Sequence, residues 1–264
     1  METKEEKKHH FVLVHGACHG AWCWYKLATL LRSAGHRVTA PDLAASGINP
    51  KQKEEIRSIS DYFQPLMEIL ASLPPDDKVI LEGHSLGGVS ISAAMEKFPH
   101  KISVAVFAAA LMPRPDFIVP KSLNQEFQKK VVSMVDTQYW FDDGPDNPPT
   151  ALLFGPEFLA SKLYELCLPE DLTLAKMLVR PISLYGGLQL LKETALSMEK
   201  YGSVSRVFIV CQEDKVLDED YQRWMIQNNP VTEIKVFPDS DHMVMLCKPI
   251  ELCTCLIDIA ERYS

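Results

Sequence analysis

The sequence lacks an excess of positive charge, a long uncharged apolar run and a phosphate-binding glycine loop. Its 264 residues carry 27 Lys and Arg against 35 Asp and Glu, a formal net charge of −8. Nucleic-acid binders need clustered cations, so we expect no nucleic-acid partner. The longest strongly apolar uncharged run, residues 102–112, is far shorter than the roughly 18 to 20 residues that cross a bilayer, so we expect no membrane span. The missing glycine loop indicates no nucleotide cofactor.

A secretory leader and regularly spaced cysteines are lacking as well. The chain begins METKEEKKHH, which is charged and has no apolar leader segment. We therefore expect residues 1–9 to be a disordered tail of a cytoplasmic protein. The seven cysteines are odd in number and irregularly spaced, in a chain too large to need stabilising disulfides. This pattern predicts free thiols in a reducing compartment.

Short apolar segments alternate with helical patterns along most of the chain. Helices are expected over 22–33, 58–73 and 86–97. The apolar segments are rich in β-branched residues, which predicts strands buried on both faces of a mostly parallel sheet. Right-handed crossovers make such an α/β sheet doubly wound. The expected strands cover residues 10–14, 37–40, 78–81, 103–108, 206–211 and 233–237.

Residues 112–185 break this alternation. Prolines interrupt short helical segments there, such as the one over 172–179. We expect this segment to leave and re-enter the sheet at the carboxyl ends of its strands, where open α/β folds bind ligands. We therefore predict a core of residues 10–111 and 186–264, with residues 112–185 inserted as a lid.

A G-x-S-x-G motif, Gly83-His84-Ser85-Leu86-Gly87, lies between an expected strand and an expected helix. A strand-to-helix elbow of this kind holds a nucleophilic serine in a strained turn, with small residues on either side. A plain glycine-rich turn is the alternative, and the strand and helix around the motif disfavour it. Ser85 is therefore the predicted nucleophile.

A serine nucleophile needs a base and an acid, which follow it along the chain in this architecture. His242 follows the last expected strand and is the predicted base. Asp214 follows the penultimate strand and is the predicted acid. Glu213 and Asp241 are alternatives, but an acid that reaches the far imidazole nitrogen is better presented from a loop other than the histidine's own.

Acyl transfer also needs two backbone N–H groups that hold the oxyanion. Leu86, directly after the nucleophile, is predicted to supply one. Ala17, in the glycine-containing loop after the first strand, is predicted to supply the other. His15, Cys18 and His19 of the same loop could be metal ligands, but no second cluster completes four ligands, so we predict no metal.

Longer strings in the sequence resemble the plant methylesterase family of α/β-hydrolases. This family includes methyl salicylate, methyl jasmonate and methyl indole-acetate esterases, polyneuridine aldehyde esterase and the α-hydroxynitrile lyases. The resemblance runs from about His10 to the C-terminus and is dense in HFVLVHGACHGAWCWYKL, KVILEGHSLGG and DHMVMLCKP. It implies the α/β-hydrolase fold with an inserted helical cap, no cofactor, and Ser85, Asp214 and His242 as nucleophile, acid and base.

Two positions separate the esterases from the lyases of this family. The lyases carry Thr in the first loop and Lys after the catalytic histidine, whereas this chain has Gly16 and Met243. The resemblance therefore implies an esterase that acts on a small-molecule methyl ester, with His84 lining the pocket. In the cap, Met134 stands where salicylate esterases have an aromatic residue, which predicts a pocket not shaped for a flat benzoate.

The acyl group of the substrate stays open at this stage. The strings SGINP, KISVAVF and LAKMLVRP resemble polyneuridine aldehyde esterase, which implies an alkaloid β-aldehydo ester whose acid product then decarboxylates. Plant hormone esters are the other candidates. A hydroxynitrile-lyase-like carbon–carbon lyase and a hydrolase-fold ligand receptor are the alternative functions. Formation of a homodimer is also left open.

Overall fold

A central parallel sheet organises the protein. The structure, a computed structural model, describes residues 8–115, 135–185 and 193–264. In this part of the chain the sheet has six strands in the order β2-β1-β3-β4-β8-β9, all paired in parallel. All six predicted strands are confirmed, although β3 continues to His84 rather than ending at Leu81. The strands are β1 (His10–Val14), β2 (Arg37–Thr39), β3 (Val79–His84), β4 (Ile102–Ala108), β8 (Arg206–Cys211) and β9 (Glu233–Phe237).

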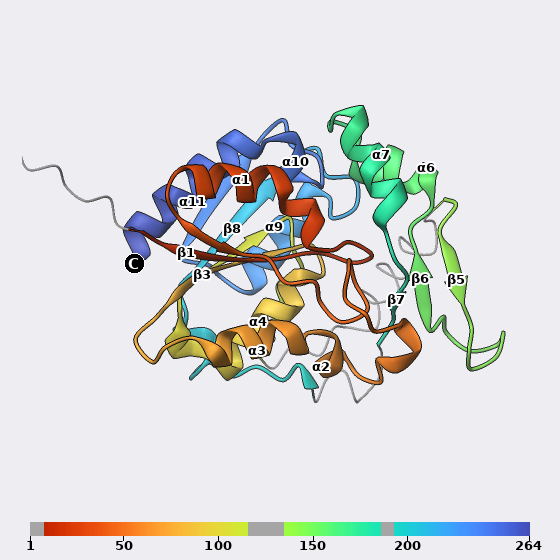
Figure 1. The fold of residues 1–264 in the computed structure, drawn as a ribbon, viewed down its shortest axis with the longest axis horizontal. Helices are drawn as coiled ribbons and strands as arrows, with labels where there is room; N and C mark the ends of the chain where they lie inside the picture. Colours follow the sequence, from red (N-terminus) through yellow and green to blue (C-terminus); the bar gives the residue numbers. More distant parts are fainter. Residues whose placement is uncertain (1–7, 116–134, 186–192) are drawn as a thin grey trace, which may run out of the picture.

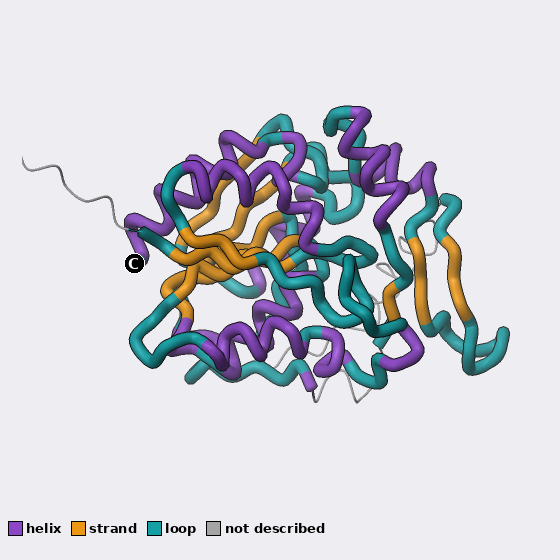
Figure 2. Tube along the Cα trace, viewed as in Figure 1, coloured by secondary structure: helices purple, strands orange, loops and turns teal. Residues whose placement is uncertain are grey.

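Helices cover both faces of this sheet, as Figures 1 and 2 show. α1 (Tyr25–Ser33) and α11 (Pro249–Tyr263) pack together on one face, and α3 (Gln64–Ser72) and α4 (Gly87–Lys97) lie on the other. The predicted doubly wound α/β fold is thereby confirmed. None of the described helices is both long and apolar enough to cross a membrane. Further helices with described bounds outside 112–185 are α2 (Ile59–Tyr62), α9 (Glu219–Asn228), α10 (Val244–Cys247) and the 3-10 turns η1 (Ala21–Trp24), η2 (Lys53–Glu55), η3 (Pro99–Lys101) and η5 (Tyr201–Ser203).

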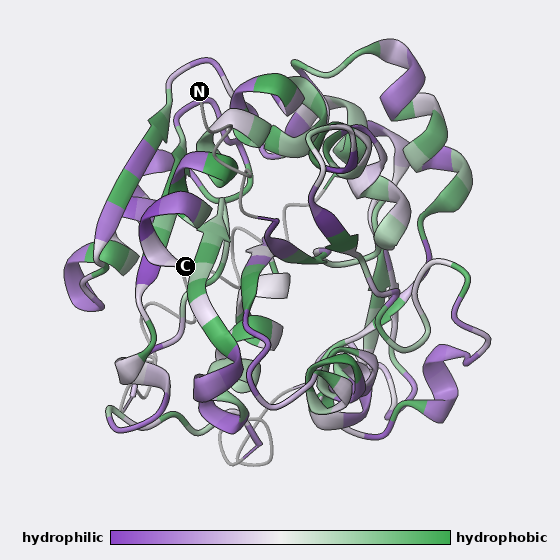
Figure 3. Ribbon diagram, turned by 60° about the vertical axis from the view of Figure 1, so that its left-hand side comes forward, coloured by the Kyte–Doolittle hydropathy of each residue, from purple (hydrophilic) through white to green (hydrophobic). Residues whose placement is uncertain are grey.

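The inner strands form the core because both of their faces are covered. Every residue of β1, β3 and β8 is buried. Phe107 and Phe208 stack between neighbouring strands with their ring centroids 6.4 Å apart. The edge strand β9 instead alternates between half-buried and exposed residues, because successive side chains point to opposite faces of the sheet and one face is better covered there. Figure 3 shows helices that carry both hydrophilic and hydrophobic residues around the sheet.

The chain leaves the sheet at the carboxyl end of β4 and rejoins it at the amino end of β8, whereas the sequence led us to expect both connections at carboxyl ends. The described residues 135–185, which we call the insertion, lie beside the sheet in Figure 1. The expected cap was helical, but its described part also contains a three-stranded antiparallel sheet, β5-β6-β7. These strands have three residues or fewer, too short to show an alternating pattern in the sequence. The elements are β5 (Gln138–Trp140), β6 (Ala151–Leu153), α6 (Pro156–Phe158), the π-turn η4 (Leu159–Leu163), α7 (Pro169–Leu178) and β7 (Ile182–Ser183).

The N-terminal end of the described chain is packed against the sheet. Residues 1–7 of the expected tail lie outside the described residues. His9 is buried, and its ring lies 6.5 Å from that of Phe11 and 5.5 Å from that of His36. The chain is therefore already part of the fold one residue before β1.

Candidate active site

Ser85 lies on the turn between β3 and α4, at the carboxyl edge of the sheet. Its φ of 53° is in the left-handed region, which is strained for a residue with a side chain. The Ser85 carbonyl accepts the N–H groups of Gly88 (3.1 Å) and Leu111 (3.0 Å), which hold the turn. A Cβ on Gly87 would lie 2.6 Å from the Val14 carbonyl oxygen, so α4 can start this close to β1 only with glycine. The elbow leaves Ser85 half-buried.

Asp214 and His242 meet from two different loops. Asp214 follows β8, His242 follows β9, and both are buried. His242 Nδ1 lies 2.7 Å from Asp214 Oδ2, while Asp214 Oδ1 accepts the N–H groups of Val216 (2.7 Å) and Leu217 (2.9 Å). A carboxylate held this way keeps the imidazole proton on Nδ1, which leaves Nε2 as the acceptor.

The two alternative acids lie away from the imidazole. Glu213 is exposed, so its carboxylate is solvated. Asp241 is buried, but its oxygens accept the N–H groups of Leu166 (2.8 Å) and Met243 (3.0 Å). Of the three acids considered from the sequence, the described structure places Asp214 alone against His242.

His84 connects the serine turn to the histidine loop. Its Nε2 lies 2.8 Å from the carbonyl oxygen of His242, and the two ring centroids are 4.7 Å apart. Burial lowers the pKa of His84 well below its ordinary value, so the ring is neutral and donates through Nε2. The expected contact of His84 with substrate stays a prediction. Within the described chain, Ser85 Oγ has no hydrogen bond to His242; such bonds often tighten only when substrate binds.

The loop after β1 lies directly against Ser85. A Cβ on Gly16 would lie 2.8 Å from the Cβ of Ser85 and 3.1 Å from Nδ1 of His84, so this approach requires glycine. Ala17 follows it in the loop. Among the described residues, the N–H groups of Ala17 and Leu86 donate to no other protein group, which leaves both available to an oxyanion.

A side chain from the insertion holds this loop in place. His19 Nδ1 bonds to the carbonyl oxygen of Ala17 (2.7 Å), and Nε2 bonds to the hydroxyl of Tyr164 (2.7 Å). The His19 ring stacks on both Trp22 and Tyr164. Burial lowers the pKa of His19 to about 4, so the ring is neutral near pH 7. The sequence offered no signal for Tyr164, because its partner lies 145 residues away.

The other two residues considered as metal ligands in this loop have separate structural contacts. His15 bonds to the Gly16 carbonyl (2.8 Å) and accepts the Leu43 N–H (3.1 Å). Cys18 Sγ donates to the carbonyl of Leu152 (3.7 Å). Within the described chain, His15, Cys18 and His19 do not gather into a metal-binding group.

Met243 and Met134 are the two other predicted substrate contacts, and their contact with substrate stays a prediction. Met243 is fully buried, directly after His242. Met134 lies outside the described residues. A cavity of about 590 Å³ is lined by residues such as His10, Arg37 and Lys78, which stand at the amino ends of the strands. This cavity is therefore at the opposite edge of the sheet from Ser85.

The insertion contacts the predicted catalytic and oxyanion loops. Its Leu166 N–H donates to Asp241, next to His242. Glu165 forms an ion pair with Lys215, next to Asp214. The Arg180 N–H donates to the Cys18 carbonyl at 2.9 Å in the loop that carries Ala17. The segment is thus anchored to the loops around the site.

Comparison with known proteins places this arrangement among enzymes. The alpha/beta hydrolase family matches residues 11–251. Methyl jasmonate esterase 1 of Vitis vinifera is 59% identical over 98% of this chain and 100% of its own length. Polyneuridine aldehyde esterase of Rauvolfia serpentina is 48% identical over 98% of this chain and 97% of its own length. The crystal structure of a tomato methylketone synthase I mutant is 51% identical, with a TM-score of 0.93, over 98% of this chain and 100% of that one.

Proposed function

The chain belongs to the plant methylesterases of the alpha/beta hydrolase family, and we propose that its hydrolysis of a carboxylic methyl ester takes place at Ser85. The observation that carries this assignment is the buried contact of 2.7 Å between His242 and Asp214, next to the strained turn of Ser85. A base fixed in one tautomer beside an accessible hydroxyl is the arrangement that serine acyl transfer requires.

In the first half of the reaction, Nε2 of His242 takes the Ser85 proton while Oγ attacks the ester carbonyl carbon. The carbonyl electrons move onto oxygen, and the N–H groups of Ala17 and Leu86 hold the resulting oxyanion. When the carbonyl re-forms, the methoxy group leaves with the proton from His242 as methanol. Asp214 stabilises the imidazolium that exists between these steps.

In the second half, water replaces Ser85 on the acyl group. His242 takes a proton from the water, whose oxygen attacks the acyl carbon, and the same N–H groups hold the second oxyanion. The bond to Ser85 then breaks, and His242 returns the proton to Oγ. The products are the free carboxylic acid and methanol, and no cofactor takes part.

We propose that residues 112–185 act as the cap over this site, with residues 10–111 and 186–264 as the hydrolase core. The contacts of Tyr164 with His19 and of Leu166 with Asp241 support this division, because they join the insertion to both sides of the catalytic group. A cap in this place excludes water from the ester and shapes the acyl pocket.

Jasmonate is the acyl group that we propose first. The identity to methyl jasmonate esterase 1 (59%) exceeds the identity to polyneuridine aldehyde esterase (48%), so a hormone ester has more support than an alkaloid ester. A β-keto acyl group is the second candidate, because a histidine variant of the tomato methylketone synthase was crystallised with β-ketoheptanoate. The lyase alternative has less support, because the lyases carry Lys directly after the catalytic histidine. This chain has the uncharged Met243 at that position, fully buried.

The test is methanol release from methyl jasmonate, methyl salicylate, a methyl β-ketoester and an alkaloid β-aldehydo methyl ester. We expect turnover of methyl jasmonate by the native protein and by the control variant Ser72→Ala, which changes an exposed serine. In Ser85→Ala we expect kcat to fall by at least about 10³-fold. If Ser85→Ala still releases methanol at the native rate, Ser85 is not the nucleophile. Tight binding of an intact ester without turnover would favour the alternative function, a hydrolase-fold ligand receptor.

We also propose that the enzyme acts in the cytoplasm. All seven cysteines are free, and several, such as Cys23 and Cys211, are fully buried. Free thiols in this number suit a reducing compartment. Imaging of a fluorescent fusion in plant cells tests the location, and a signal confined to the secretory pathway would contradict it.

A further inference from the structure

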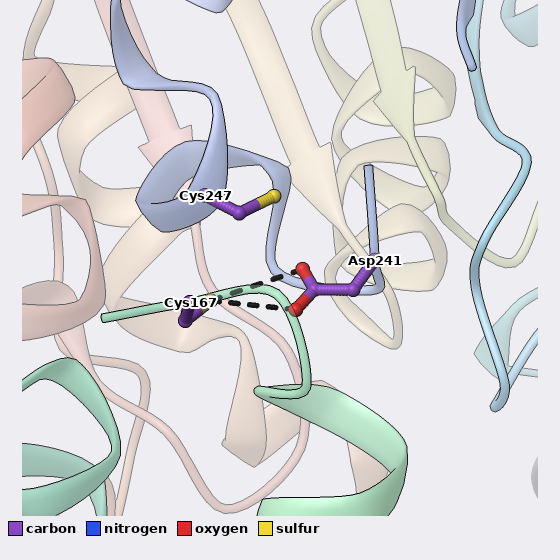
Figure 4. A group of neighbouring side chains, drawn as sticks. All are labelled: Cys167, Asp241 and Cys247. Atoms are coloured by element: carbon purple, nitrogen blue, oxygen red, sulfur yellow. Dashed lines mark hydrogen bonds between the residues drawn. The ribbon is translucent and has the colours of Figure 1, made fainter. Parts of the chain in front are cut away.

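Three side chains of metal-ligating type converge where the insertion meets the histidine loop (Figure 4). Cys167 comes from the insertion, Asp241 directly precedes His242, and Cys247 is the last residue of α10. Their ligand atoms all lie within 4.8 Å of one another. Cys167 Sγ lies 3.5 Å and 3.8 Å from the two oxygens of Asp241, and the sulfur of Cys247 points toward the same carboxylate.

These separations are close to those of a tetrahedral metal centre. Zinc binds sulfur at about 2.3 Å and a carboxylate oxygen at about 2.0 to 2.2 Å. At tetrahedral angles, a sulfur and an oxygen are then about 3.5 Å apart and two sulfurs about 3.8 Å apart. The distance from Cys167 Sγ to Asp241 already fits. The sulfur of Cys247 needs to move by about 1.3 Å at most to complete the group.

The chemistry of the three side chains selects a soft divalent cation. Two thiolates favour zinc, cobalt or cadmium over magnesium and calcium, which prefer oxygen ligands. The Asp241 oxygens each accept one N–H group, from Leu166 and Met243, and a carboxylate has about four acceptor positions, so coordination need not break these bonds.

The surroundings of the group also suit a metal ion. Ser240 is fully buried, and its hydroxyl lies 3.3 Å from Cys247 Sγ, which orients that sulfur. Cys167 and Cys247 are half-buried, so an ion can enter and a water can take the fourth position.

We propose that Cys167, Asp241 and Cys247 bind one thiophilic divalent cation, with Zn²⁺ as the cellular candidate. Each thiol releases its proton to solvent as its sulfur binds the ion, so one cation displaces two protons and binds more tightly as the pH rises. The bound ion joins the insertion to the loop of His242. The site is separate from Ser85 and takes no part in ester hydrolysis.

Cobalt(II) added to the reduced, chelator-treated full-length protein is the direct probe. We expect one equivalent to produce a thiolate-to-cobalt charge-transfer band in the near ultraviolet, together with the visible bands of tetrahedral cobalt. Zn²⁺ should abolish both by displacement. Cys167→Ser and Cys247→Ser are expected to weaken cobalt binding by at least about 100-fold, since each removes a thiolate ligand.

Cys255→Ser is the matched control, because Cys255 is a half-buried cysteine of α11 outside the group. It should bind cobalt like the native protein. Circular dichroism and thermal unfolding without metal identify any variant that fails to fold, and Asp241→Asn then serves as an additional test that leaves both sulfurs in place.

Two results would overturn the proposal. One is the lack of a stoichiometric thiolate–cobalt band in the native protein. The other is an unchanged cobalt affinity in folded Cys167→Ser and Cys247→Ser, which would place the ion elsewhere. Oxidation of the pair to a disulfide is distinguished by a mass lower by two hydrogens and by the loss of cobalt binding until a thiol reductant is added.

Discussion

Replacing Glu82 with Gln is expected to stabilise the protein at pH 8 far more than at pH 5. Glu82 lies in the middle of β3, paired with Leu13 and Val106 on the neighbouring strands, and is fully buried. Neither carboxyl oxygen has a hydrogen-bond partner in the described part of the chain. Burial therefore raises the pKa of Glu82 from 4.5 to about 8.

The size and sign of the effect follow from proton linkage. Between pH 4.5 and pH 8 the folded protein keeps the Glu82 proton that the unfolded chain loses, so the free energy of unfolding falls as the pH rises. Each pH unit in this window costs about 1.4 kcal/mol. Integrated from pH 5 to pH 8 with these two pKa values, the loss is roughly 3 to 4 kcal/mol. The amide of Glu82→Gln does not ionise and escapes this loss.

Urea denaturation under reducing conditions, followed by tryptophan fluorescence, measures the effect. The difference in unfolding free energy between Glu82→Gln and the native protein should grow by roughly 3 to 4 kcal/mol between pH 5 and pH 8. Glu261→Gln, which changes an exposed carboxylate, should follow the native curve. If the Glu82→Gln and native curves stay parallel across this range, Glu82 is not held protonated by burial, and the reasoning is wrong.

Three further predictions concern contacts of the insertion. Tyr164→Phe removes the hydroxyl bonded to His19, so kcat/KM for the ester should fall about 10-fold, the equivalent of one hydrogen bond; unchanged steady-state kinetics would contradict this. Arg180→Ala removes the guanidinium bonds to three carbonyls of the 47–51 loop and should lower the urea unfolding free energy by about 2 kcal/mol. Lys26→Met leaves the buried carboxylate of Asp171 without its cation and should cost about 3 kcal/mol, largely restored by adding Asp171→Asn. A double variant no more stable than Lys26→Met in thermal unfolding would refute the last point.

The sheet and the serine turn could be predicted from sequence because they depend on neighbours along the chain. A buried parallel strand appears in the sequence as a short run rich in β-branched residues. The strands β1, β8 and β9 begin and end at the predicted residues. The G-x-S-x-G motif marks a turn whose glycines are needed for close backbone approach, as the surroundings of Gly87 show.

Helix ends and the small sheet were harder to predict. The expected helix over 58–73 is divided into α2 and α3, with Phe63 between them and Pro65 in the first turn of α3. The strands of the small sheet are too short to stand out among prolines. Each gains its stability from its partner strands rather than from its own pattern.

The sequence alone determined the fold class, the serine turn, and the two loops that carry Asp214 and His242. These features follow from hydrophobic periodicity, chain order and glycine spacing, all of which are local. Only the tertiary structure decided that Asp214 contacts the His242 ring, while Asp241 accepts the N–H group of Leu166 in the insertion. It also paired His19 with Tyr164 and brought Cys167 to Cys247. Such pairs join residues far apart in the chain, and no local pattern encodes which distant side chains packing will bring into contact.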